Sequence, residues 1–253
     1  MQRYFLEEFY VSEKKTVQLS GEQAHHVLHV LRMREGGQVY LVFREERSFL
    51  AKIVKIDLEI VTFSLLEEEL QKKELPVQVT IAHSFSKGEK LEWIVQKATE
   101  LGMYSLLAFP SERSVVRWDA KKLLKKQERL LKIAKEAAEQ SGRTHIPLLD
   151  LLISKHELFQ KLEEYDVVAV AYEKMSQLGE QAKLMQFFLK LEKGMKALVV
   201  FGPEGGLSPG EIEEFIKRDA IILGLGPRIL RTETAPLYFL SALSYELELR
   251  IEQ

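Results

Sequence analysis

The stretch VVFGPEGGLSPGEIEEF at residues 199–215 combines an apolar run, a glycine-rich loop and the start of a helix. Residues 198–201 are apolar and include β-branched side chains, which is typical of a buried strand. Ser208 and Glu211 have the spacing of a capping box, and Pro209 occupies the first helical position. Loops that lead from a strand to a helix lie at the carboxyl edge of α/β sheets, where ligands bind. The stretch therefore predicts an α/β fold with a binding site at this loop.

The loop at residues 202–206 restricts the kind of ligand that can bind there. Its glycines allow the main chain to approach a ligand closely, but the loop has no Lys or Arg and carries Glu204. Neither the phosphate-binding motif G-x-x-x-x-G-K-[ST] nor the dinucleotide motif G-x-G-x-x-G occurs in the chain. A carboxylate among backbone amides disfavours a polyphosphate and is compatible with a neutral or partly cationic ligand. The alternative is an ordinary glycine-rich turn without a ligand.

A second loop of similar character follows, in the sequence ILGLGPRILRTETAP at residues 222–236. Its glycines again come directly after an apolar run, and Thr232 or Thr234 can cap the helix that follows. Two such loops at the ends of successive strands can form two walls of one pocket. The apolar Leu225, Ile229 and Leu230 suit a flat heterocycle, and free main-chain groups can contact its edge.

The rest of residues 77–253 alternates between strand and helix patterns. Apolar runs at 77–83, 104–109, 166–172, 197–201 and 220–225 predict strands. Helical patterns occupy the sequence between and after them, including 119–140, a segment near 178–192 and 236–250. This alternation predicts a largely parallel sheet with crossover helices.

Residues 1–66 have a different pattern. Apolar runs at 38–43, 48–56 and 60–66 are separated by short polar stretches, which predicts a hairpin-connected sheet. One helix precedes them, with Ser20 and Gln23 as a capping box. Short strands and a single helix indicate a small barrel. Because residues 67–76 are charged and end in Pro, we expect a linker there and domains at 1–72 and 73–253.

Composition excludes several classes of protein. The 253 residues are 46% hydrophobic and 29% charged, as in soluble globular domains. The absence of cysteine excludes disulfides, thiol catalysis and Cys-based zinc sites. Because the chain has no signal-peptide pattern and no apolar run long enough for a bilayer, we expect a cytoplasmic protein that does not contact a membrane. No metal is expected, since Glu22, His26 and His29 lack the H-E-x-x-H pattern.

Two positively charged segments are candidates for nucleic-acid contact. The net charge is −2, so any such surface must be a local patch. The helix predicted at 119–140 is rich in Lys and Arg, which also fits the solvated side of an amphipathic helix. His25, His29, Arg32 and Arg34 lie beside the predicted barrel and could contact RNA phosphates.

Taken together, several motifs resemble a known family. FGPEGGLSPGEIE and LGPRILRTETA, preceded by QKATELG, SERSV, EQSGR and AYE, are similar to the bacterial small-subunit ribosomal RNA (uracil-N3) methyltransferases of the RsmE type. That family belongs to the SPOUT class. The resemblance extends over the whole chain, because RYF and HHVLHVLRM match the family's PUA-like RNA-binding domain. It implies a trefoil-knotted parallel sheet with crossover helices, preceded by a small PUA-like β-barrel, in a homodimer.

The resemblance also implies a reaction and a set of site residues. The expected activity is methylation of N3 of a uridine, expected to be uridine-1498, in 16S rRNA of the small ribosomal subunit, with S-adenosyl-L-methionine as cofactor. The expected cofactor-binding residues are Gly202, Pro203, Glu204, Gly205, Gly206, Leu223, Gly224, Leu225, Gly226, Ile229 and Leu230. The expected RNA-binding residues are Arg3, His25, His29, Arg32, Arg34, Lys87, Arg113 and Arg117.

The chemistry of uracil indicates which side chains catalyse the transfer. N3 carries a proton, so the attacking species is best as the uracil anion. Arginine suits stabilisation of that anion, and Arg143 and Arg231 in the motifs EQSGR and RTETA are the candidates. Glu173 or Glu233 would accept the proton. Two alternatives are a noncatalytic RNA-binding protein and a nucleotide-using α/β enzyme, for which the missing phosphate-loop lysine is counter-evidence.

Overall fold

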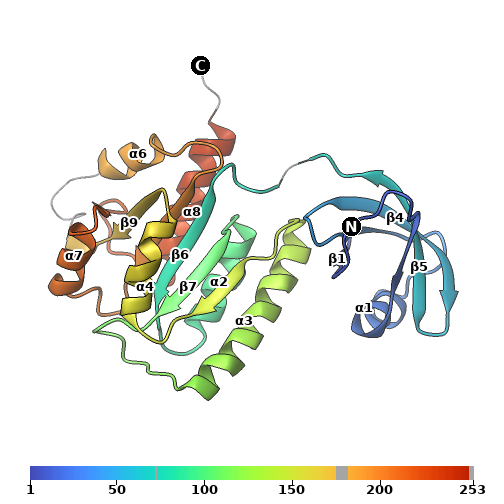
Figure 1. Ribbon diagram of the computed structural model, residues 1–253, viewed down its shortest axis with the longest axis horizontal. Helices are drawn as coiled ribbons and strands as arrows, with labels where there is room; N and C mark the ends of the chain where they lie inside the picture. Colours follow the sequence, from blue (N-terminus) through green and yellow to red (C-terminus); the bar gives the residue numbers. More distant parts are fainter. Residues whose placement is uncertain (72, 175–181, 251–253) are drawn as a thin grey trace. The chain divides into compact units, whose positions relative to one another are not determined.

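The computed structural model describes residues 1–71, 73–174 and 182–250, with no side-chain description at 182. The chain forms two compact units (Figure 1). The first unit is Met1–Lys73 together with Ala138–His145, and the second is Glu74–Ala137 together with Ile146–Gln253. The unit boundary lies beside the predicted one at residues 72 and 73, where Lys72 itself is outside the described residues.

The first unit contains a curved five-stranded sheet. Its strands, in spatial order, are β1 (Arg3–Phe5), β3 (Gln38–Val42), β4 (Ser48–Asp57), β5 (Ile60–Glu68) and β2 (Thr16–Leu19). All neighbours are antiparallel except β1 and β3, which are parallel. Two irregularities in the pairing of β4 with β5 bend the sheet. The concave arrangement buries one apolar core that includes Tyr4, Leu41 and Phe63.

The helical segment that precedes β3 in this unit differs from the prediction. Helix α1 (Gly21–His25) continues into the π-helix η1 (His26–Val30), and Arg32 with a φ of 53° follows it. The predicted capping box is wrong, because the side chain of Ser20 makes no capping hydrogen bond. Gln23 instead donates from Nε2 to the main-chain oxygen of Phe5 at 2.8 Å. The side chain of Gln23 therefore contacts β1 instead of the first turn of its own helix.

The second unit is built on a six-stranded, all-parallel sheet, which confirms the predicted sheet with crossover helices. In spatial order the strands are β11 (Ile221–Leu223), β9 (Val167–Ala171), β10 (Lys196–Phe201), β6 (Gln78–Ser84), β7 (Ser105–Phe109) and β8 (Leu148–Leu151). Since β10 lies between β9 and β6, strands far apart in the chain end side by side at one edge. That edge carries both glycine loops.

Helices cover both faces of this sheet (Figure 1). One apolar core involves α2 (Lys90–Glu100), α3 (Ala120–Ser141), α6 (Ala182–Phe188) and α8 (Ala235–Ser244). The opposite core involves α4 (Lys155–Lys161), with the 3-10 turn η2 (Leu162–Glu164), and α7 (Pro209–Ile216). After α8 the chain forms the π-helix η3 (Tyr245–Leu249).

The predicted helix near 178–192 is found from Ala182, and residues 178–181 lie outside the described residues. The predicted helix at 119–140 corresponds closely to α3, and that at 236–250 to α8 with η3. In the described parts of the chain, no helix has the length and apolar character needed to cross a membrane.

Candidate functional site

Loops at the carboxyl ends of β9, β10 and β11 enclose a cavity of about 350 Å³ together with the first turn of α2. Six charged side chains line it, and they carry equal numbers of positive and negative charges. These are Lys90, Arg228, Arg231, Glu173, Glu204 and Glu233. The apolar part of the wall includes Leu225, Ile229 and Leu230, the three side chains that the sequence predicted for it.

The loop after β10 is folded tightly on itself. A Cβ atom on Gly202 would lie 2.9 Å from the main-chain nitrogen of Leu207. Gly206 has a φ of 66° and donates from its main-chain nitrogen to the oxygen of Pro203 at 2.8 Å. The predicted capping box of α7 is confirmed, with Ser208 and Glu211 exchanging hydrogen bonds. Gly202 is therefore required by packing within the loop itself, before any ligand is considered.

Not every predicted cofactor residue reaches the cavity. Leu223 is fully buried in the core, and Gly205, Gly224 and Gly226 are not among the lining residues. Gly226 has a φ of 90°, so its glycine character serves the turn of the second loop. The members that do line the cavity are Gly202, Pro203, Glu204, Gly206, Leu225, Ile229 and Leu230.

Thr232 joins the two loops rather than capping a helix. Its Oγ1 donates to the main-chain oxygen of Gly202 at 2.7 Å and lies 3.1 Å from Nε2 of His83. Of the two alternatives predicted for the cap of α8, Thr234 occupies the N-cap position, but its side chain makes no capping hydrogen bond. His83, at the end of β6, is buried, and its Nδ1 lies 2.7 Å from the main-chain oxygen of Ser84. Burial lowers the pKa of His83 despite these hydrogen bonds.

Lys90 supplies the positive charge that the loop after β10 lacks. Its Nζ lies 2.8 Å from Oε1 of Glu204 and 3.5 Å from Oε2 of Glu233. Burial raises the pKa of Glu204, but the hydrogen bonds from Lys90 and from main-chain nitrogens, together with the charge of Lys90, outweigh burial and hold that pKa below its usual value. The sequence prediction missed Lys90, His83 and Thr232, because they lie far from the loop at residues 202–206 in the sequence.

The predicted catalytic residues are divided between the two units. Arg231, Glu173 and Glu233 line the cavity. Oε2 of Glu233 is buried without a hydrogen-bond partner, whereas Glu173 is exposed. Arg143 belongs to the first unit, is 2% exposed and is not among the lining residues. The structure therefore brings three of the four together.

The predicted RNA-binding residues of the first unit fall into two groups. Arg3 is 1% exposed, and its guanidinium donates to Ser48 at 2.8 Å and to Glu69 at 2.7 Å. This prediction is corrected, because the guanidinium is buried in an ion pair with Glu69 and is not accessible to a phosphate. The exposed members are His25, His29, Arg32 and Arg34.

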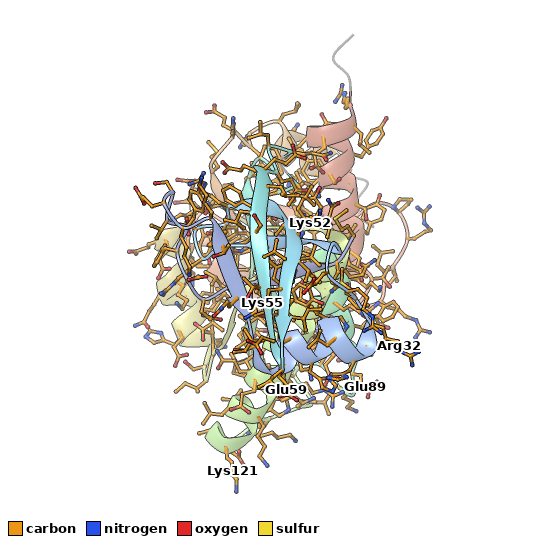
Figure 2. All side chains as sticks on the ribbon, turned by 90° about the vertical axis from the view of Figure 1, so that its right-hand side faces the viewer. Arg32, Lys52, Lys55, Glu59, Glu89 and Lys121 are labelled. Atoms are coloured by element: carbon orange, nitrogen blue, oxygen red, sulfur yellow. The ribbon has the colours of Figure 1, made fainter. Side chains whose placement is uncertain are left out.

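The exposed members of the first unit lie on one continuous segment. The rings of His25 and His29 are 4.8 Å apart, and the chain continues directly into the two arginines. Figure 2 shows Arg32 at one end of the helical segment. These four residues form a basic segment that presents donors to solvent.

In the second unit, Lys87, Arg113 and Arg117 are exposed. Arg113 donates from Nη1 to the main-chain oxygen of Gly205 at 3.0 Å, so it contacts the loop after β10 from outside the cavity. The described residues contain no group of three or more His, Asp or Glu side chains placed to hold a metal ion.

Comparisons with known proteins identify both parts of the chain. Residues 73–244 match an RNA methyltransferase domain, and residues 19–66 match an RNA methyltransferase PUA domain. Ribosomal RNA small subunit methyltransferase E of Bacillus subtilis is 44% identical over 251 residues, which cover 98% of each chain. Its namesake from Mycobacterium tuberculosis is 30% identical over 227 residues, covering 88% of this chain and 84% of that protein.

Two solved structures share the fold over nearly the whole length. A ribosomal RNA small subunit methyltransferase E from Neisseria gonorrhoeae, bound to S-adenosyl methionine, superposes with a TM-score of 0.81 at 27% identity. The superposed region covers 97% of this chain and 98% of the N. gonorrhoeae chain. A methyltransferase from Legionella pneumophila, in complex with the same cofactor, has a TM-score of 0.80 at 28% identity and covers 96% and 97%.

Proposed function

Because this chain belongs to the RNA methyltransferase family that includes ribosomal RNA small subunit methyltransferase E, we propose that it is an S-adenosylmethionine-dependent methyltransferase of small-subunit ribosomal RNA. The observation that carries the proposal is the cavity enclosed by the loops after β9, β10 and β11. Two relatives of the same fold were solved with this cofactor bound.

The residues present fit this cofactor. Leu225, Ile229 and Leu230 offer an apolar wall for the adenine ring, and the tight turn at Gly206 leaves main chain without side chains beside the cavity. Oε2 of Glu233 is buried without a hydrogen bond and lies 3.5 Å from Nζ of Lys90, so it retains lone pairs that could accept from a hydroxyl or an ammonium group of the cofactor. When bound, S-adenosylmethionine supplies a methyl group activated by a sulfonium.

We further propose that the methyl acceptor is N3 of a uridine, expected to be uridine-1498. Arg231 would stabilise the charge that spreads onto the carbonyl oxygens as N3 loses its proton. No described residue forms an ion pair with Arg231 or Arg228, so both guanidinium groups have donors available at the cavity. Of the two candidate bases we favour Glu233, since its Oε2 is buried in the cavity wall and makes no hydrogen bond, whereas Glu173 is exposed.

Titration calorimetry with S-adenosylmethionine, S-adenosylhomocysteine and ATP tests the cofactor. We expect binding of the first two and none of ATP. Binding of RNA without either cofactor form would favour a noncatalytic RNA-binding protein, and binding of ATP alone would favour a nucleotide-using enzyme.

Single-turnover methylation tests the role of Arg231. With cofactor and RNA saturating, Arg231→Ala should lower the rate by about 10²–10³-fold, while cofactor affinity changes little. Arg218→Ala is the matched control, because that guanidinium is paired with Glu214 at 2.7 Å on α7, outside the cavity. Equal rates for the wild type and Arg231→Ala would assign the anion-stabilising role to another residue.

A further inference from the structure

The first turn of α2 contacts both loops that line the cavity. The ammonium of Lys90 is within hydrogen-bonding distance of Glu204 on the loop after β10, and it is 3.5 Å from Glu233 on the loop after β11. The side chains of Lys90, Glu204 and Glu233 are 32%, 32% and 19% exposed, respectively. One cation therefore connects three segments that are distant from one another in the sequence.

The two carboxylates depend on this cation to different degrees. Glu204 also accepts from the main-chain nitrogen of Lys87 at 3.4 Å, so the turn before α2 contacts it in addition to Lys90. Glu233 has a buried Oε2 without any hydrogen bond, and Lys90 is the cation that forms an ion pair with it among the described residues. Without Lys90, two partly buried carboxylates on neighbouring loops would repel each other.

We propose that Lys90 is a positioning residue that holds the two loops together and keeps the cavity in the shape that binds S-adenosylmethionine. The inference rests on the proposed function, since it names that cofactor as the ligand. Arg228 and Arg231 lie on the loop that carries Glu233, but neither forms an ion pair with a described residue, so neither replaces Lys90 between the loops.

The test compares Lys→Met substitutions at two positions of α2. Lys90→Met keeps most of the side-chain length and removes the charge. Lys97→Met is the matched control, because Nζ of Lys97 pairs with Glu100 at 2.8 Å and the residue does not line the cavity. Calorimetry should show that Lys90→Met weakens binding of both S-adenosylmethionine and S-adenosylhomocysteine by at least about tenfold. Lys97→Met should change either affinity by less than about twofold.

Two further variants separate positioning from simple packing. Lys90→Arg keeps the charge and the donors, so it should retain most of the affinity. In the double variant Lys90→Met with Glu204→Gln, the uncompensated carboxylate is gone, so binding should be tighter than in Lys90→Met alone. If the aliphatic part of the Lys90 side chain acted only by packing, the second substitution would not restore cofactor affinity. If Lys90→Met fails to fold, Lys90→Gln carries the same comparison.

The possible outcomes are distinguishable. Wild-type affinity of Lys90→Met for both ligands overturns the inference. Tighter binding of S-adenosylmethionine alone also overturns it, because Lys90 would then act only by repelling the sulfonium. If the wild-type protein binds neither ligand, the proposed function fails and the inference fails with it. Weaker binding of both ligands, with recovery in the double variant, supports both.

Discussion

His83 shows how one buried side chain organises the site. It lies next to the last residue of β6, which pairs with β10 in the centre of the sheet, and its imidazole contacts Thr232 on the loop after β11. Thr232 in turn donates to Gly202 on the loop after β10. Burying a charged imidazole costs far more free energy than burying a neutral one, so this arrangement is most stable when His83 is uncharged.

The lowered pKa of His83 makes the stability of the protein depend on pH. The unfolded chain takes up a proton near the ordinary value of 6.5, whereas the folded protein resists it, so stability falls as pH drops below about 6.5. His83→Asn removes this titration. The difference in unfolding free energy between wild type and variant should therefore be largest at pH 7.5 and decrease toward pH 5.5, by at most about 1.4 kcal/mol per pH unit. Denaturant unfolding measures it, and a constant difference would contradict the prediction.

At the scale of elements, the loop after β10 determines the shape of the cavity. Gly202 lies where the loop turns back on itself, and the two atoms that a Cβ at this position would approach most closely belong to the main chain of the same loop, at 2.9 and 3.0 Å. Main chain cannot move aside as a flexible side chain can. A methyl group at this position therefore opens the loop.

Gly202→Ala should weaken binding of S-adenosylmethionine by at least about tenfold and lower stability by about 1–3 kcal/mol. Gly210→Ala on α7 is the control. Its added methyl would have only Oγ of Ser208 within reach, at 3.9 Å, and alanine is the better helix former, so stability should hold or rise slightly. Calorimetry and thermal unfolding of both variants provide the comparison. Unchanged cofactor affinity in Gly202→Ala would separate this loop from the binding site.

The sequence predicted those elements whose apolar pattern or capping residues lie within a short stretch of the chain. The apolar runs of β6, β9 and β10 and the capping box of α7 lie within short windows, and each was found. The order of the strands has no such signal. Lys90 and Glu204 are separated by 114 residues, and His83 and Thr232 by 149, so only the folded sheet brings them together. Local periodicity contains no information about such pairs.

At the scale of the whole molecule, the end of the chain presents an apolar surface. Tyr238, Tyr245 and Leu249 on α8 and η3 are 37%, 61% and 66% exposed. Large exposed apolar side chains on neighbouring turns are typical of protein interfaces. We therefore propose that this surface joins two copies of the chain in a homodimer.

Light scattering coupled to gel filtration tests the dimer. Tyr245→Glu with Leu249→Glu should convert a dimer into monomers, because the introduced carboxylates would be buried without partners. Ile153→Glu is the control, since Ile153 is 71% exposed and follows β8, away from α8 in the sequence. A monomeric wild type, or a double variant that remains dimeric, would contradict this assignment.

The position of the methyl group in the reaction product distinguishes the proposed chemistry from every alternative. Small ribosomal subunits from cells that lack the modification are incubated with the purified protein and S-adenosylmethionine, and the 16S rRNA is digested and analysed by mass spectrometry. We expect one 3-methyluridine, in the fragment that contains uridine-1498, and none when the cofactor is omitted. A methyl group on ribose, on carbon or on another base would contradict the proposed chemistry, and the absence of any methylated product would contradict the proposed function.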